Sequence, residues 1–143
     1  MKTIKYLFII VAFLFVGIAN AQKNYLAPAD TPAQISKYVK QHFPDGQIAY
    51  VKKKDKLHYT KYKVKLDTQV ELEFDGDFNI YEIESKSPLP ASVIPPKIQH
   101  YVSQHYPTHQ IKEWELKKNG QKVELTNDVD LLFDREGNFL KID

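Results

Sequence analysis

The segment that decides the fold is ISKYVKQHFPDGQI, residues 35–48, because the chain repeats its pattern as IQHYVSQHYPTHQI, residues 98–111. A second pair of matching stretches follows, residues 64–83 and residues 123–142. Self-similarity at a near-constant spacing is the mark of a duplicated structural unit. The sequence therefore predicts two copies of one fold in tandem.

The repeats define the domain organisation. We place the first repeat at residues 22–85 and the second at residues 86–143, and expect residues 22–143 to form one structural unit. The two copies are joined at Lys86-Ser87-Pro88, the first residues of the second range.

Residues 1–21 have the features of a cleavable export signal. Lys2 and Lys5 precede an apolar run, and Ala19 and Ala21 are the small residues that a signal peptidase reads. The apolar run, residues 6–18, is shorter than the roughly 20 residues of a membrane-spanning helix. We therefore expect cleavage after Ala21 and a periplasmic or secreted protein with no membrane contact after cleavage.

Charge and cysteine content exclude several classes of protein. The chain has 20 Lys and Arg against 18 Asp and Glu. Removal of Lys2 and Lys5 with the signal leaves 20 − 2 = 18 positive charges, which balance the negative ones. A nucleic-acid partner is not expected, since phosphate contacts need a basic surplus. The absence of cysteine excludes disulfides, thiolate metal sites and a Cys nucleophile.

Each repeat begins with a helical pattern and continues with a strand pattern. Ile35, Tyr38, Val39 and His42 follow the helical spacing, and Pro44 ends the helix. The period then changes to two, with strands expected near residues 47–53 and 110–117 and in the segments that follow them. The fold class is therefore α+β: two tandem helix-plus-four-strand repeats, with an antiparallel sheet in a two-layer arrangement.

The alternation also assigns side chains to faces of the sheet. Because one helix per repeat covers only one face, the other is expected to be open to water. We assign Tyr81, Ile83, Leu140 and Ile142 to the buried face and Asn119-Gly120 to a two-residue hairpin turn. The residues assigned to the open face are Tyr59, Lys61, Lys63, Lys65, Glu71, Glu73, Ile80, Glu82, Glu84, Glu113, Glu115, Glu124, Asp130, Leu132 and Lys141.

The repeat resembles the PepSY-like domain family of secreted bacterial proteins, also described as beta-lactamase-inhibitor-like. The likeness rests on a helix that ends in Gln-His-aromatic-Pro and on the motif Phe133-Asp134 followed by residues 137–142, Gly-Asn-Phe-Leu-Lys-Ile. The first repeat departs from the motif, because Gly76 is displaced and Ile80 replaces the aromatic residue. The resemblance implies one continuous sheet of eight strands and a fold like that of the beta-lactamase inhibitor protein, whose concave sheet face grips its target.

No catalytic or metal site is expected. The serines show no nucleophile-elbow pattern, and no glycine-rich phosphate loop is present. Five histidines leave open a small-ligand or metal-binding role. His42 and His105 occupy equivalent helix ends, and His100 and His105 are five residues apart, which does not bring their rings together as an i, i+4 pair would. We therefore predict no cofactor and no metal ligand.

The first hairpin is four residues longer than the second, which we interpret as two extra residues per strand. Its tip, residues 52–56, is rich in lysine and is flanked by Tyr50, His58 and Tyr59. One interpretation is a basic and aromatic projection that contacts an acidic partner. The other is a sheet edge that lysines protect from aggregation.

These observations favour a non-enzymatic binding module over an enzyme. We expect it to contact another envelope or secreted protein, as an inhibitor or regulator, through its open sheet face and first hairpin. The alternative is a periplasmic protein that binds a small ligand or a metal through its histidines. The predicted partner-binding residues are Tyr50, Lys54, Lys56, Tyr59, Lys61, Lys63, Lys65, Glu71 and Glu73.

Overall fold

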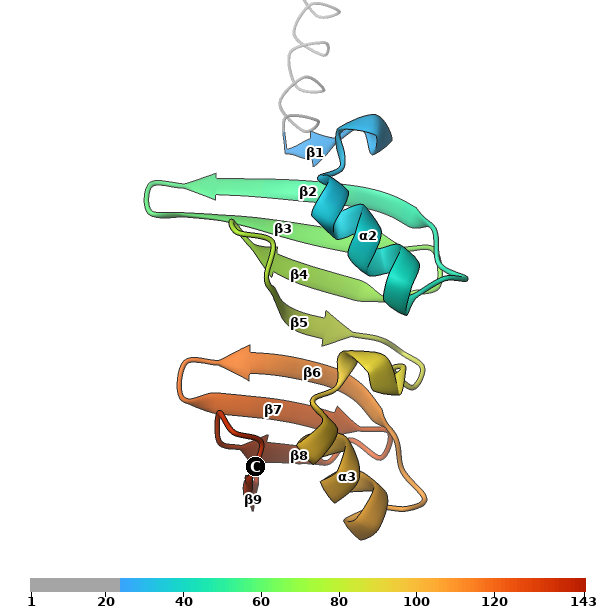
Figure 1. The fold of residues 1–143 in the computed structure, drawn as a ribbon, viewed down its shortest axis with the longest axis vertical. Helices are drawn as coiled ribbons and strands as arrows, with labels where there is room; N and C mark the ends of the chain where they lie inside the picture. Colours follow the sequence, from blue (N-terminus) through green and yellow to red (C-terminus); the bar gives the residue numbers. More distant parts are fainter. Residues whose placement is uncertain (1–23) are drawn as a thin grey trace, which may run out of the picture.

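The computed structural model describes residues 24–143, so the predicted signal and its cleavage site lie outside the described residues. Within these residues, each repeat has a short 3-10 helix, an α-helix and four strands in the same order, and the additional strand β1 precedes those of the first repeat (Figure 1). The elements are β1 (Tyr25–Leu26), η1 (Pro28–Asp30), α2 (Ala33–His42), β2 (Ile48–Lys56), β3 (Tyr59–Leu66), β4 (Glu71–Asp75), β5 (Ile80–Glu84), η2 (Ala91–Val93), α3 (Pro96–His105), β6 (Ile111–Lys117), β7 (Gly120–Leu125), β8 (Asp130–Phe133) and β9 (Phe139–Ile142).

All the strands form one antiparallel sheet in the order of the sequence, from β1 to β9. The two repeats join where β5 pairs with β6, with Ile83 opposite Trp114. The expectation of eight strands was wrong, because the segment before α2 adds a ninth. This short strand, β1, pairs Tyr25 with Lys52 and Leu26 with Val51.

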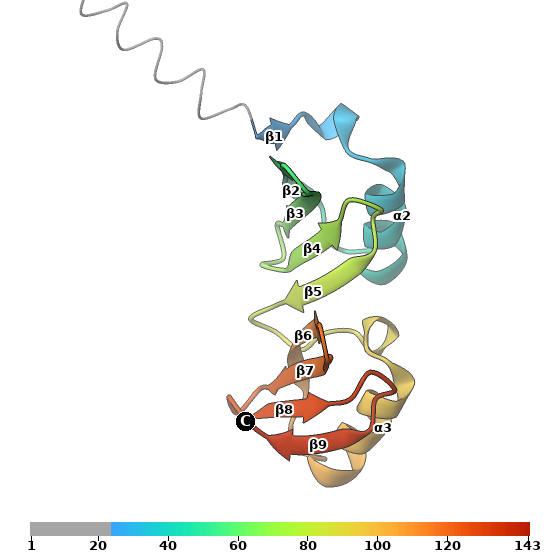
Figure 2. The same ribbon diagram turned by 90° about the vertical axis from the view of Figure 1, so that its left-hand side faces the viewer.

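Both helices lie against the same face of the sheet, α2 over the first repeat and α3 over the second (Figure 2). Each helix buries its apolar stripe, as Ile35 and Ile98 show at 0% exposure. The two helices also contact the sheet alike, because the rings of Tyr38 and Phe74 meet edge to face at 5.4 Å. In the second repeat Tyr101 and Phe133 meet in the same way at 5.5 Å.

A β-bulge near the start of the last strand of each repeat changes which side chains face the helix. In the first repeat the bulge places Ile80 opposite Phe74, so Ile80 packs against the core instead of lying on the open face as predicted. Tyr81, predicted to be buried, reaches the open face. In the second repeat the bulge falls at Leu140, which was predicted to be buried and is 58% exposed. Ile142 lies opposite the buried Leu131, as its predicted facing requires, but it is 58% exposed at the end of the outermost strand. A bulge adds one residue, so the alternation is interrupted there and resumes in the predicted phase at Ile83, which is buried.

The two β-hairpins that open the sheet of each repeat differ in length as expected. Strands β2 and β3 have nine and eight residues, whereas β6 and β7 have seven and six. The turn of the second hairpin is Lys118-Asn119, so the prediction that Gly120 is a turn residue was wrong. Gly120 begins β7, where a Cβ atom would lie 2.2 Å from the Phe133 carbonyl oxygen. A close approach of two strands, and not a turn, requires this glycine.

Candidate functional site

The open face of the first repeat is built from alternate residues of β3 and β4. Lys61, Lys63 and Lys65 alternate with Tyr62, Val64 and Leu66, whose side chains are buried under α2. Lys63 lies opposite Glu73 and Lys65 opposite Glu71. The structure thus brings together the five predicted site residues of these strands, Lys61, Lys63, Lys65, Glu71 and Glu73, on one surface.

Ion pairs connect the two strands across this face. The Lys61 Nζ donates to Glu73 Oε2 at 2.9 Å, and the Lys65 Nζ donates to Glu71 Oε1 at 2.9 Å. Lys63 pairs closely with Glu71 and lies 3.7 Å from Glu73. Hydrogen bonds from Lys63 and Lys65 hold the pKa of Glu71 below its ordinary value. These carboxylates are therefore charged and engaged within the sheet.

Tyr81 is a member of this surface that the sequence pattern missed. Its hydroxyl donates to Glu73 Oε2 at 2.5 Å. Burial and this hydrogen bond raise the pKa of Tyr81 to about 12. The Lys61 ammonium also lies 6.0 Å from the centre of the Tyr81 ring. The same alternation that correctly buries Ile83 places Tyr81 in the core, so only the bulge reveals its position.

The first hairpin, β2 and β3 with the turn Leu57-His58, extends the surface toward its tip. Tyr50 lies opposite Lys65, and Lys56 lies opposite Tyr59. The remaining predicted residue, Lys54, lies opposite Lys61, so all nine predicted partner-binding residues share one face.

Lys52 was predicted to lie in the lysine-rich tip but not among the partner-binding residues, although it has the same parity as Lys54. Lys52 lies opposite Lys63, and its ammonium is 5.5 Å from the centre of the Tyr25 ring. The Tyr25 and Tyr50 rings meet edge to face at 5.4 Å. An exposed aromatic pair therefore borders the lysines at the β1 side of the sheet.

The interpretation of this segment as a protected sheet edge applies only to part of β2. Strand β1 pairs with Val51 and Lys52, and the Lys53 backbone N–H donates to the Asn24 carbonyl at 2.8 Å. Within residues 24–143, the outer backbone edge of β2 beyond Lys53 has no strand partner. Lysines at a free edge hinder unwanted strand pairing, so this interpretation remains open for residues 54–56.

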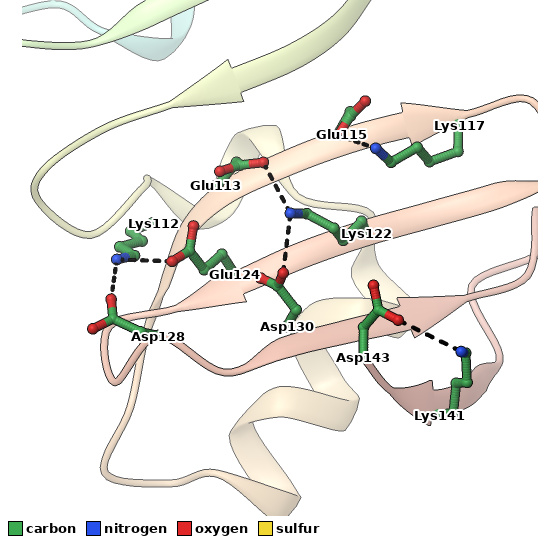
Figure 3. Close-up of polar contacts among 10 residues, drawn as sticks. All are labelled: Lys112, Glu113, Glu115, Lys117, Lys122, Glu124, Asp128, Asp130, Lys141 and Asp143. Carbon is green, nitrogen blue, oxygen red and sulfur yellow. Dashed lines mark hydrogen bonds and ion pairs between the residues drawn. The ribbon is translucent and has the colours of Figure 1, made fainter.

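The open face of the second repeat has a different charge pattern, which Figure 3 shows. The Lys122 ammonium lies between Glu113 and Asp130, at 3.6 Å and 3.2 Å. Lys112 pairs with Glu124 at 3.1 Å. Burial raises the pKa of Glu113 despite the nearby Lys122. Carboxylates, not lysines, dominate this half of the face.

The junction of the repeats places like charges side by side. Glu82 lies opposite Glu115 and Glu84 opposite Glu113 across the β5–β6 pair. Burial, followed by repulsion from Glu73 and Glu115, raises the pKa of Glu82. The open face therefore changes from basic on the first hairpin to acidic at the junction.

The histidines do not form a metal-binding group in the described part of the chain. No three His, Cys, Asp or Glu side chains between residues 24 and 143 are arranged to hold a metal ion. The His42 Nδ1 lies 3.0 Å from the Ser92 Oγ, which ties the end of α2 to the linker. His105 stacks on Tyr101 at 4.2 Å. Within the described residues no carboxylate hydrogen-bonds to His42, so its pair with Ser92 lacks the third member of a catalytic triad.

This architecture, two helix-and-four-strand units that share one sheet and leave one face open, defines the class of protein. The family described as "Putative beta-lactamase-inhibitor-like, PepSY-like" matches residues 18–82 and again residues 81–141. The chain belongs to this family, with two copies of its domain. Neither α2 nor α3 has the length and apolar character needed to cross a bilayer, and the same is true of every other helix in residues 24–143.

Solved structures share the fold over nearly their whole length. A "putative calcium-regulated periplasmic protein" of Bacteroides thetaiotaomicron is 30% identical and has a TM-score of 0.78, with 84% of this chain and 95% of that chain covered. A putative periplasmic protein of the DUF2874 family from Bacteroides vulgatus is 29% identical and has a TM-score of 0.77, with 83% and 94% covered. No curated protein sequence matches the chain.

Proposed function

We propose that this chain is an exported, non-enzymatic binding module that contacts another protein through the open face of β2, β3 and β4. The observation that carries the proposal is the asymmetry of the sheet. Both helices cover one face, while the other presents exposed tyrosines and lysines on a hairpin longer than its counterpart. Tyrosine is favoured at protein interfaces because its ring is large, stiff and amphipathic.

Export to the periplasm is part of the proposal. The solved relatives are described as periplasmic proteins, and residues 1–21 have the composition of a signal peptide. A partner would therefore be another protein of the envelope or a secreted protein.

The proposal includes an inhibitory or regulatory role, which the description of the family as beta-lactamase-inhibitor-like supports. A protein that blocks an enzyme needs a rigid surface with anchoring side chains, and a paired sheet provides one at small entropic cost. The Lys61–Glu73 and Lys65–Glu71 pairs hold four of the side chains in place. Fold alone does not define the target, so the proposal extends only to a protein partner.

Affinity capture from envelope extract tests the proposal. The purified protein is immobilised, and the retained proteins are identified by mass spectrometry. We expect a specific partner that is lost when Lys61, Lys63 and Lys65 are all changed to Glu. The control is Lys37→Glu with Lys40→Glu, since both lysines are exposed on α2, away from the open face.

A second variant guards against misfolding of the triple substitution. Lys61→Glu with Glu73→Lys reverses the charges at the surface but keeps an opposite-charge pair between β3 and β4. Circular dichroism confirms that each variant folds. Retention of the same partner by both folded open-face variants, or capture of no partner by the wild-type protein, contradicts the proposal.

A further inference from the structure

Four lysines meet on the open face of the first hairpin. The register places Lys52 directly opposite Lys63 and Lys54 directly opposite Lys61. Like charges at directly opposite positions destabilise a sheet. Repulsion between these opposed lysines therefore destabilises the hairpin, and a ligand of opposite charge would remove that repulsion.

Carboxylates of the protein neutralise only part of this cluster. Lys61 pairs with Glu73, and Lys63 pairs with Glu71. Within residues 24–143 Lys52 and Lys54 take part in no ion pair. The β2 side of the cluster therefore carries charge that is not compensated by the described residues.

The four lysines surround a pocket. Its volume is about 160 Å³, and it is lined by Lys52, Lys54, Lys61, Lys63 and Glu73. We call it the four-lysine pocket. A cavity of this size has room for carboxylate groups, and the ammonium groups around it provide hydrogen-bond donors as well as charge.

The second repeat shows that the fold does not require these lysines. Its corresponding hairpin pairs Glu115 with Lys122 and Lys117 with Gly120. The Lys117 ammonium also pairs with Glu115 at 2.6 Å. At the positions where the first repeat has four lysines, the second has two lysines, one glutamate and one glycine. The excess positive charge is therefore specific to the first hairpin.

We propose that the four-lysine pocket binds carboxylates of an acidic, extended segment of a partner protein. This inference rests on the proposed function, which it deepens by naming the chemistry of the partner. Two features favour a polypeptide over a free anion. The outer edge of β2 beyond Lys53 is unpaired within residues 24–143 and offers backbone hydrogen bonds to an added strand. Tyr25, Tyr50 and Tyr59, exposed by 47%, 37% and 55%, lie on the same face as the lysines that line the pocket and add apolar contact area.

The spacing of the lysines defines the probe. Lys54 and Lys56 are two residues apart on the unpaired part of β2 and face the same side as Lys52, so an added strand with Glu at alternate positions would present its carboxylates to Lys54 and Lys56. A fluorescein-labelled peptide of alternating Glu and Thr is titrated with the purified protein, and fluorescence anisotropy gives the Kd. We expect measurable binding that weakens with added salt.

The decisive variant is Lys52→Glu with Lys54→Glu, which changes lysines that support no ion pair in the described structure. We expect this variant to weaken peptide binding by about tenfold or more, since two charged contacts become repulsive. Lys37→Glu with Lys40→Glu makes the same change in net charge on α2 and should alter the Kd by about twofold or less.

Three results would overturn the inference: equal weakening by the two double variants, no peptide binding to the wild-type protein, or displacement of the peptide by an equimolar amount of inorganic phosphate. The first indicates a general charge effect, and the last a site for small oxyanions. If any of these results is obtained but a partner is still captured from envelope extract, the inference about the pocket is wrong and the proposed function stands. If the peptide binds at the pocket but no partner is captured, the acidic-segment chemistry is supported and the proposed function is contradicted.

Discussion

The loop before the last strand of each repeat has the same hydrogen bonds but different residues at its strained position. Between β4 and β5, Asn79 donates its side-chain amide to Asp75 at 3.0 Å, and between β8 and β9, Asn138 donates to Asp134 at 2.7 Å. The residue just before each asparagine has a positive φ. It is Gly137 at +82° in the second repeat, but Phe78 at +64° in the first. Only glycine adopts this conformation without steric cost.

Different contacts hold the two loops against the sheet. In the first repeat the Phe78 ring packs on Tyr62 at 5.2 Å. In the second repeat the buried Gln121 donates to the Arg135 carbonyl at 3.1 Å and accepts from the Trp114 indole at 2.9 Å. The first repeat therefore offsets backbone strain with aromatic packing, whereas the second avoids the strain and fixes its loop with hydrogen bonds.

The largest expected difference between the repeats is at the start of their second strands. Gly120 occupies the place that Lys61 has in the first repeat, and an added Cβ would lie 2.2 Å from the Phe133 carbonyl oxygen. We predict that Gly120→Ala lowers the free energy of unfolding by about 3 kcal/mol, because the β7 and β8 backbones must separate. Lys61→Ala should cost less than about 1 kcal/mol, since it removes one partly exposed ion pair.

Urea denaturation of the two variants measures this difference. If Gly120→Ala and Lys61→Ala lower the free energy of unfolding by similar amounts, the backbones of β7 and β8 are no closer than those of β3 and β4.

An intermediate effect is expected in the loops. We predict that Gly137→Ala costs about 1–2 kcal/mol, because a side chain at this φ is strained and its Cβ would lie 3.1 Å from the Lys97 Cβ. Phe78→Gly has two opposing effects, relief of strain and loss of a half-buried ring, each about 1–2 kcal/mol. The net change should therefore be below about 1 kcal/mol.

Thermal unfolding followed by circular dichroism compares the two loop variants. A cost for Phe78→Gly as large as that for Gly137→Ala would show that packing on Tyr62 far exceeds the backbone strain.

The smallest effect is the pH dependence of two glutamates on the open face. The pKa of Glu71 is lowered by Lys63 and Lys65, so its stabilising effect is present above the ordinary value of 4.5 and is lost as pH falls through its lower folded pKa. Burial raises the pKa of Glu82, so its charge destabilises the fold at neutral pH, and that penalty vanishes as pH falls to 4.5.

We therefore predict that at neutral pH Glu82→Gln stabilises the protein and Glu71→Gln destabilises it, each by about 0.5 kcal/mol after solvent screening. Urea titrations at several pH values measure both. The gain from Glu82→Gln should disappear below pH 4.5, and a gain that persists there would have a cause other than charge.

Periodicity predicted most of the fold because burial is periodic. The stripe on each helix and the alternation of Lys61, Lys63 and Lys65 with buried residues follow from the sequence alone. An even number of added residues in the first hairpin preserved that alternation, so all nine predicted partner-binding residues lie on one face.

The errors have two physical causes. A bulge changes which face of the sheet a side chain lies on, but no particular residue types mark it in the sequence. For this reason Ile80 and Tyr81 exchanged their predicted environments. Long-range contacts between strands were also invisible, since neither the pairing of Tyr25 with Lys52 nor the close approach of Phe133 to Gly120 is encoded locally. Lys52, already placed in the lysine-rich tip, could have been added to the partner-binding residues from its parity with Lys54.

The bulge after each loop provides a position whose side chain can change without any change in the core. At Tyr81 and at Leu140, which correspond in the two repeats, a side chain lies outside the core although the preceding residue, Ile80 or Phe139, packs against it. One repeat uses this position for a phenol that hydrogen-bonds a carboxylate, and the other for an exposed aliphatic side chain. A duplicated protein can thus acquire new chemistry at this point in one copy while the interior of both copies stays the same.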